Sequence, residues 1–362
     1  MPSAHHLGVA NDPLPIIDVH THASGDGADG PPEDIVRCMD ACGVEQVFLF
    51  APLLGVHGLD LTDEHFDDIR RHNDYIAHYC SSAPDRLLAF CVLNPNPHIA
   101  GRDPRAATER MIEEARRCYH ELGIRGVKMV PDRWTAEDED VLPLFTELAN
   151  LGMYVAFHSG IFLDGRSSSY CRPASFEGVH RVPDFHGHLA HLSWPWVDEC
   201  IATLAMETFH ADEVGKDHWQ LKADLSFGCP ADWQVDSVRK ALDMLPHDML
   251  LYGSDVFWPC DPVRYLEEFV YPQLTNFEAA ATLSRSASNQ GSAARIALRR
   301  AVFYDNARAH WQAATRTTPQ QPLRQSHTPH TPNARPRRSE RRQRMRAAGV
   351  PPGVNQPQQT MA

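Results

Sequence analysis

The sequence predicts a (β/α)8 barrel followed by a tail that has no fold of its own. Short apolar, β-branched runs recur at intervals of roughly 30 residues, and segments with helical spacing of apolar residues follow them. Eight such strands are typical of a barrel of parallel strands, which needs ~250 residues or more. A doubly wound open sheet is the main alternative, but no glycine-rich phosphate loop follows the first strand.

The expected elements alternate along the chain. The apolar runs place strands at 15–19, 44–50, 87–93, 124–130, 154–157, 188–192, 221–225 and 249–252. Amphipathic spacing places helices at 32–42, 63–82, 104–122, 141–150, 196–209, 233–245, 262–273 and 293–311. In such a barrel the functional residues lie at the carboxyl ends of the strands.

Charge divides the chain into two parts. The formal net charge is −13, yet residues 315–362 carry nine Arg, no Lys and one acid, Glu340, which leaves −21 on the preceding residues. The tail contains no Ile, Phe, Tyr or Trp, so it cannot bury enough apolar surface to offset the entropy of ordering it. We therefore expect a flexible start (1–13), a barrel (14–312) and a disordered Arg-, Pro- and Gln-rich tail (313–362).

Composition argues against several functional classes. The acidic body argues against nucleic-acid binding as the main function, because phosphate contacts need clustered cations. No apolar run approaches the ~20 residues of a membrane helix, and residues 1–13 lack the pattern of a signal peptide. The nine cysteines form no C-x-x-C pair and indicate reduced thiols. We expect a cytoplasmic protein with a small-molecule substrate, and self-association is left open.

Four histidines and one aspartate fall at the ends of expected strands. His20 and His22 end the first strand and, because side chains alternate along a strand, point to the same face. His158 ends the fifth strand, His191 ends the sixth, and Asp255 follows the eighth. A barrel would gather all five at one mouth, which predicts a metal site.

Two other histidines compete for the role at the sixth strand. His186 and His188 form a second His-x-His pattern. Strand parity puts His188 on the face opposite His191, and His191 is closer to the end of the run. We therefore assign the sixth-strand role to His191.

Lys128 interrupts the apolar fourth strand. Residues 1–314 hold only four lysines against 21 arginines, so a Lys at this position suggests a role that Arg cannot fill. The structural alternative is a head group that reaches the rim. Arg172 and Trp194 follow strands, where a cation and an aromatic ring could contact a carboxylated, unsaturated substrate.

These motifs resemble the amidohydrolase superfamily, specifically the amidohydrolase-related group, which contains aminocarboxymuconate-semialdehyde decarboxylase-like enzymes, pyrone-dicarboxylate lactonase and metal-dependent hydrolases. The resemblance rests on the Asp-x-His-x-His strand, the later single histidines and Gly-Ser-Asp at 253–255, and it covers roughly residues 15–312. It implies that the metal ligands are His20, His22, His158 and Asp255. Insertions at 162–179 and 207–219 depart from the common pattern and leave the substrate open.

The same resemblance implies roles for the neighbouring residues. Asp255 would exchange a proton with the reacting water. His191 would be a second metal ligand or the acid/base group. In relatives with two metals a carboxylated Lys at the position of Lys128 bridges them, whereas in relatives with one metal a cation there would bind a substrate carboxylate.

The donor set suits Zn²⁺ or another divalent ion, with one or two ions and a position open for water. We favour a hydrolase, in which metal-activated water attacks the carbonyl of a lactone, amide or related bond and His191 stabilises the oxyanion. The alternative is a non-oxidative decarboxylase (carboxy-lyase), in which the same residues position and protonate an unsaturated or aromatic acid while CO₂ leaves.

Two further interpretations stay open. Residues 17–27 also resemble the opening of the polymerase and histidinol phosphatase family of metal-dependent phosphoesterases, whose last strand usually ends in Asp-x-His where this chain has Gly-Ser-Asp. An inactive barrel that acts as a scaffold through its tail would lack at least one ligand, yet every expected position is filled.

Overall fold

The structure, a computed structural model, describes residues 14–25, 28–53, 61–162, 165–214, 219–226 and 228–315, with the backbone alone for 210–214. The expected flexible start lies outside the described residues. The expected tail lies outside them from residue 316 onward, whereas residues 313–315 belong to the last helix, α10 (Asn306–Thr315).

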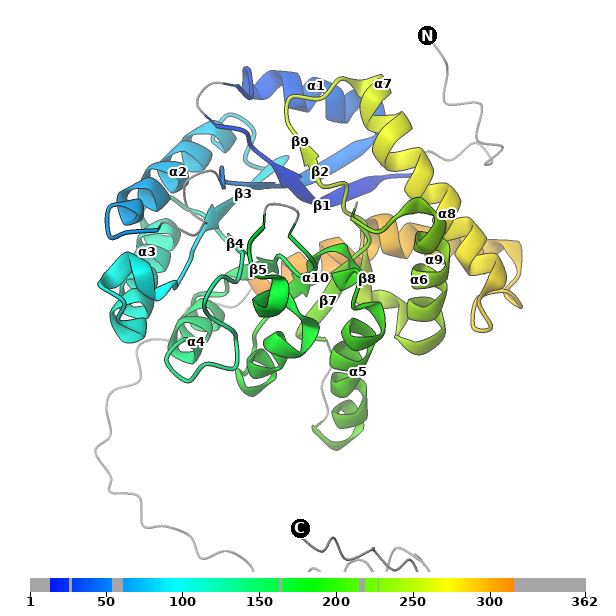
Figure 1. Cartoon of the computed structure of the whole chain (residues 1–362). Helices are drawn as coiled ribbons and strands as arrows, with labels where there is room; N and C mark the ends of the chain where they lie inside the picture. Colours follow the sequence, from blue (N-terminus) through cyan, green and yellow to red (C-terminus); the bar gives the residue numbers. More distant parts are fainter. Residues whose placement is uncertain are drawn as a thin grey trace, which may run out of the picture. The chain divides into compact units, whose positions relative to one another are not determined.

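Parallel strands form one curled sheet in the described part of the chain (Figure 1). Its order is β8-β7-β6-β5-β4-β3-β2-β1-β9. The strands are β1 (Ile16–His22), β2 (Val44–Phe50), β3 (Leu87–Val92), β4 (Gly126–Met129), β5 (Tyr154–Phe157), β6 (Gly187–Leu189), β7 (Leu221–Asp224), β8 (Leu250–Leu251) and β9 (Val256–Phe257). The Val19 amide donates to the Tyr252 carbonyl just after β8 at 3.1 Å, so the sheet closes on its first strand. The predicted barrel of eight strands is confirmed, with β9 as a short addition beside β1.

Helices surround the sheet (Figure 1). They are α1 (Pro32–Cys42), α2 (His65–Cys80), α3 (Pro104–His120), α4 (Leu142–Leu151), α5 (Val197–Val214), α6 (Ala231–Met244), α7 (Pro262–Arg264), α8 (Tyr271–Leu283), α9 (Ser292–Arg300) and α10. Two π-helical segments, Tyr265–Val270 and Ala301–Asp305, join α7 to α8 and α9 to α10. In the region of the insertion at 162–179, the described residues form two 3-10 segments, Ser168–Cys171 and Pro173–Arg181.

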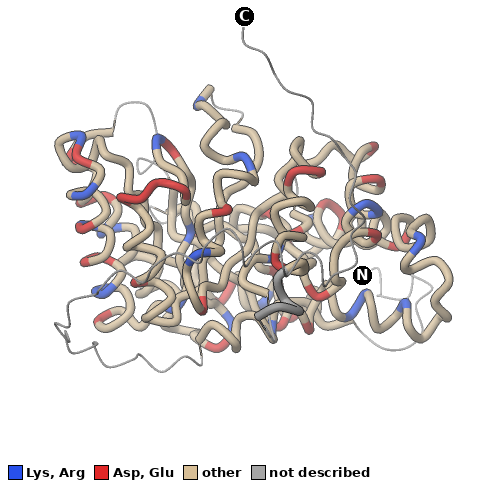
Figure 2. The backbone as a smooth tube through the Cα atoms, turned by 90° about the horizontal axis from the view of Figure 1, so that it is seen from below, with Lys and Arg blue, Asp and Glu red and all other residues tan. Residues whose placement is uncertain are grey.

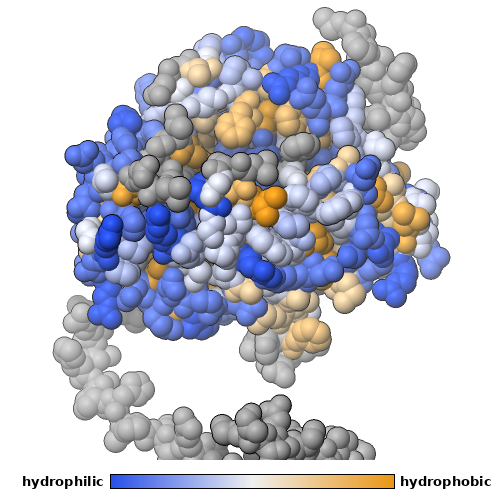
Figure 3. Space-filling view, viewed as in Figure 1, coloured by the Kyte–Doolittle hydropathy of each residue, from blue (hydrophilic) through white to orange (hydrophobic). Residues whose placement is uncertain are grey.

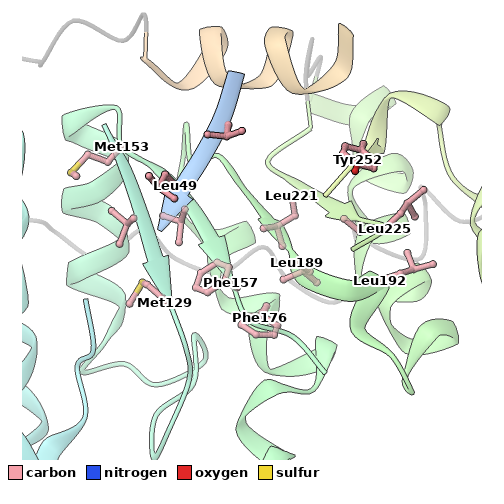
Figure 4. Packing of buried hydrophobic residues seen from close by; sticks show 14 of the residues in the cluster. Leu49, Met129, Met153, Phe157, Phe176, Leu189, Leu192, Leu221, Leu225 and Tyr252 are labelled. Carbon is pink, nitrogen blue, oxygen red and sulfur yellow. The ribbon is translucent and has the colours of Figure 1, made fainter. Parts of the chain in front are cut away.

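Alternation along the strands produces two buried layers. In β2, Val47 and Leu49 belong to the large cluster between sheet and helices, while Phe48 and Phe50 belong to the cluster inside the barrel. Figure 4 shows part of the outer layer, where Phe157 of β5 packs near Phe176 with ring centroids 4.9 Å apart. The inner layer determines which side chains can reach the barrel mouth.

An aromatic group fills one end of the barrel interior. Trp311 of α10 lies with its ring centroid 5.2 Å from Phe48, 5.7 Å from Phe90 and 6.0 Å from Tyr154. Tyr154 is the first residue of β5, so α10 lies toward the amino-terminal ends of the strands. The polar side chains predicted to be functional are therefore left to the opposite end.

Charged residues lie mainly along the outer helices and loops, with both signs interspersed (Figure 2). The face shown in Figure 3 is mostly hydrophilic, with hydrophobic residues in small groups. Among the described residues, none of the helices has the length and apolar character needed to cross a bilayer.

Asn73 joins three elements, and its replacement by Ala is expected to destabilise the fold. Its amide group donates to the Val92 carbonyl (3.2 Å) and to Glu114 (2.9 Å), and its oxygen accepts from the Val92 amide (2.7 Å). Loss of these bonds leaves buried groups unsatisfied and should lower the unfolding free energy by about 1–3 kcal/mol. Urea denaturation measures this. The same change at exposed Asn150 should have little effect, and equal effects would contradict the assignment.

Candidate metal centre

Two histidines of β1 and one aspartate after β8 form a compact triad. The Nε2 atoms of His20 and His22 lie 3.2 Å and 3.0 Å from the same carboxylate oxygen, Oδ1 of Asp255. The three ligand atoms all lie within 4.8 Å of one another. Both imidazoles are buried, while the side chain of Asp255 is 25% exposed, so the triad opens toward solvent through Asp255. The geometry is that of a site for one divalent cation.

The Gly-Ser-Asp sequence holds Asp255 against β1. A Cβ on Gly253 would lie 2.9 Å from the Cβ of His20, so only glycine allows this approach. The amide of Ser254 donates to Asp18 (2.9 Å), and the amide of Asp255 donates to the carbonyl of His20 (2.8 Å). Asp255 itself has a φ of 64°, a left-handed conformation that is uncommon for a residue with a side chain and is concentrated at functional sites.

The carboxylate of Asp224, at the end of β7, contacts the rings of two histidines. Its Oδ2 lies 2.9 Å from Nδ1 of His20 and 3.3 Å from Nε2 of His188. Its Oδ1 accepts the backbone amides of His191 (2.8 Å) and Ser226 (2.9 Å). Asp224 is fully buried, and although burial alone would raise its pKa, His20 and His188 hold that pKa well below its usual range. The carboxylate is therefore ionised and directs Nε2 of His20 toward the mouth.

Asp224 is a site residue that the sequence pattern did not predict. The residue ends an apolar strand that was itself predicted, and a carboxylate at the end of a barrel strand is the available signal. With His20 and His191 it forms a second group of close ligand atoms.

The prediction that His188 and His191 lie on opposite faces is wrong, because β6 ends at Leu189. The chain then turns through a 3-10 segment in which His191, Leu192 and Ser193 have φ of 61°, 44° and 55°. Strand parity does not extend through this left-handed run. Both histidines consequently contact Asp224: His188 through its ring, His191 through its amide.

His158 is half-buried just after β5 and reaches the mouth beside His191, with ring centroids 5.2 Å apart. Its ring stacks on Phe162 at 4.6 Å. The structure does not place it in either compact triad. Its Nε2 is nevertheless a buried atom with no hydrogen-bond partner among the described residues. Because buried polar atoms normally have a partner, this nitrogen is available to bind a ligand.

Lys128 lies inside the barrel and does not reach the rim. The side chain is 1% exposed, its Nζ is 3.3 Å from Nε2 of His20, and it sits 4.5 Å from the ring centre of Phe50. Burial lowers the pKa of Lys128 to about 8. A buried amine thus stands beside the predicted metal ligands.

Burial also sets the charge of the triad. It lowers the pKa of His20 to about 3 and, together with nearby groups, lowers the pKa of His22 and of His158. For Asp255, burial alone would raise the pKa, but His20 and His22 bring it below the usual range. Neutral imidazoles and one ionised carboxylate are the protonation states that metal binding requires, so the residues fit a divalent ion.

The remaining predicted residues lie around the mouth or outside it. Arg172 forms an ion pair with Glu199 and lies 5.1 Å from the ring centre of Trp196. Trp194 packs 6.0 Å from Trp233, and its backbone amide donates to the carbonyl of His191 (3.0 Å). The structure thus groups the two histidines of β1, Lys128, His158, His191 and Asp255, and leaves Arg172 engaged elsewhere.

The sequence profile described as amidohydrolase matches residues 17–312. The chain belongs to the amidohydrolase family. The resemblance stated from the sequence is thereby confirmed.

Two curated relatives of this chain are decarboxylases. A gamma-resorcylate decarboxylase of Rhizobium sp. (strain MTP-10005) is 32% identical over 113 residues, which is 31% of this chain and 31% of that protein. The match therefore spans less than a third of the length of the curated relative.

Solved structures share the fold of this chain. Dihydroxybenzoic acid decarboxylase of Polaromonas sp. JS666, with bound manganese and the inhibitor 2-nitroresorcinol, is 14% identical with a TM-score of 0.54 over 82% of this chain and 97% of that chain. The 5-carboxyvanillate decarboxylase of Novosphingobium aromaticivorans DSM 12444, complexed with manganese and 4-hydroxy-3-methoxy-5-nitrobenzoic acid, is 14% identical with a TM-score of 0.52 over 83% and 96%.

Proposed function

We propose that this protein is a metal-dependent, non-oxidative decarboxylase of a hydroxylated aromatic or related unsaturated acid. The observation that carries the proposal is the 113-residue similarity to gamma-resorcylate decarboxylase. The site supports it with a buried cation, Lys128, placed beside a His/Asp triad. This reverses the order favoured from sequence alone, in which hydrolysis came first.

The metal would be held by His20, His22, His158 and Asp255. Neutral imidazoles, an ionised carboxylate and the unpartnered Nε2 of His158 support this set. We propose one ion, because the carboxylate of the second triad, Asp224, already accepts several hydrogen bonds. Imidazole and carboxylate ligands bind Zn²⁺ or Mn²⁺. Manganese is present in two solved structures with this fold.

When bound, the metal would act as a Lewis acid toward the oxygens of the substrate. Lys128 would offset the charge of the substrate carboxylate. As the bond between carboxylate and ring breaks, its electron pair stays on the ring carbon and CO₂ leaves. His191 would first take up a proton from solvent at its free ring nitrogen and then deliver that proton to the carbon. Phe162 and Phe257, which stack on His158 and His22, would flank the ring of the substrate.

A product assay tests the reaction class. The full-length protein is incubated with 2,6-dihydroxybenzoate, other hydroxybenzoates, lactones and amides, and CO₂ and released acid are measured. We expect CO₂ in equal amount to the acid consumed for at least one hydroxybenzoate. Acid released from a lactone or amide without CO₂ would instead support the hydrolase.

Replacement of His158 by Ala is expected to lower the metal content of protein purified without added metal. The reason is loss of one ligand from the proposed set. Elemental analysis measures the metal bound per chain. His180→Ala, a change at a half-buried histidine outside the mouth, is the matched control. Equal metal in wild type and His158→Ala would remove His158 from the ligand set.

A further inference from the structure

Ser226 lies between a carboxylate and a predicted catalytic imidazole. It follows β7 by two residues and is 1% exposed. Its hydroxyl oxygen is 2.8 Å from Nδ1 of His191 and 3.2 Å from Nδ1 of His20, and it also bonds Oδ1 of Asp224. One hydroxyl therefore contacts three polar groups. Each contact is a hydrogen bond only if one of its two atoms carries the hydrogen and the other accepts it.

The positions of these protons follow from the number of donors. A serine hydroxyl has one proton to donate, and a carboxylate oxygen that accepts two amide hydrogens carries none of its own. Because Oδ1 of Asp224 accepts the backbone amides of His191 and Ser226, the hydroxyl of Ser226 must donate to it. The lone pairs of Ser226 then face the two Nδ1 atoms. His191 must consequently carry its hydrogen on Nδ1, as must His20, which also faces Oδ2 of Asp224.

We propose that Ser226 is a positioning residue that links Asp224 to His191 and fixes His191 in the tautomer protonated at Nδ1. Nε2 of His191 is then the atom available to exchange a proton with substrate. The importance of this atom for turnover rests on the proposed function, whereas the tautomer itself does not.

The surrounding backbone holds the ring in the same place. The amide of His191 donates to Asp224 at 2.8 Å, so one carboxylate fixes both the backbone and, through Ser226, the ring. A Cβ on Gly228 would lie 3.3 Å from Nδ1 and from two carbons of His191, which shows that the chain packs against this side of the imidazole. The ring lies 4.9 Å from that of His20.

Nitrogen NMR on histidine-labelled, full-length protein tests the tautomer, before and after removal of metal with a chelator. The His191 signals are assigned by their absence in His191→Gln. In the wild type we expect hydrogen on Nδ1 in both samples. In Ser226→Ala without metal we expect the Nε2-protonated form of His191 to become the major one, since the hydroxyl acceptor is gone. Ser226→Thr, which keeps the hydroxyl, should retain the Nδ1 form.

Activity provides the second measurement. Ser226→Ala should lower kcat about 10- to 100-fold with KM little changed, and Ser226→Thr should recover most of the loss. Ser237→Ala, which removes a hydroxyl bonded to a helix carbonyl, is the control and should leave kcat unchanged.

Two NMR results would overturn the proposal: hydrogen on Nε2 of wild-type His191 without metal, or the same tautomer in wild type and Ser226→Ala. Because the NMR samples contain no substrate, this result is independent of whether the enzyme decarboxylates.

Discussion

Replacing Asp255 with Asn should abolish metal binding and lower kcat on the order of 10³-fold. The Oδ1 atom of Asp255 is the shared neighbour of His20 and His22, at 3.2 Å and 3.0 Å. The amide keeps the size of the side chain and removes its negative charge, so the site loses its anionic ligand while its imidazoles stay in place. Metal per chain is measured by elemental analysis, and kcat on the substrate found in the product assay.

The control for this substitution is Asp261→Asn. Asp261 caps α7 through the amides of Val263 and Arg264, and Asn caps a helix about as well as Asp. Metal content and kcat should therefore match the wild type. If Asp255→Asn retained stoichiometric metal and normal kcat, Asp255 would not be a ligand, and the triad would have to be reassigned.

Asp224→Asn should reduce metal affinity and activity at least about 10- to 100-fold, although Asp224 is not in the proposed ligand set. Three donors surround its Oδ1 atom, namely two backbone amides and the hydroxyl of Ser226. The Asn oxygen must take that position, which puts the NH₂ group at Nδ1 of His20. His20 then accepts there and carries its hydrogen on Nε2, the atom needed for metal.

Titration of the variant with metal, followed by calorimetry, measures the affinity. Asp248→Asn is the matched control, since that exposed carboxylate bonds only Trp219 among the described residues. Circular dichroism checks that the barrel remains folded. Unchanged metal affinity in folded Asp224→Asn would show that His20 does not depend on Asp224 for its tautomer.

The sequence was sufficient to predict the barrel and most of the mouth. Period-two alternation gives β2 its inward Phe48 and Phe50 and places His20 and His22 on one face of β1. Asp255 was found because a polar residue after an apolar run must lie at the carboxyl edge of the sheet. These inferences depend only on local periodicity and on the parallel arrangement of the strands.

Other features depend on contacts that periodicity does not encode. β6 ends at Leu189 because three successive residues adopt left-handed conformations, and no glycine marks the change. Asp224 gains its role from His20, which is distant in sequence. The ion pair of Arg172 with Glu199 of α5 likewise depends on how the helices pack, so local periodicity could not predict it.

The aromatic group at one end of the barrel interior affects how the chain folds during its synthesis. Trp311 is translated after every described strand, yet it packs on Phe48, Phe90 and Tyr154. A nascent chain that has produced all the predicted metal ligands still lacks the residue that covers these three rings. Their apolar surface must stay open to water or to chaperones until α10 emerges, so maturation of the barrel interior is a late step that follows translation of the whole body.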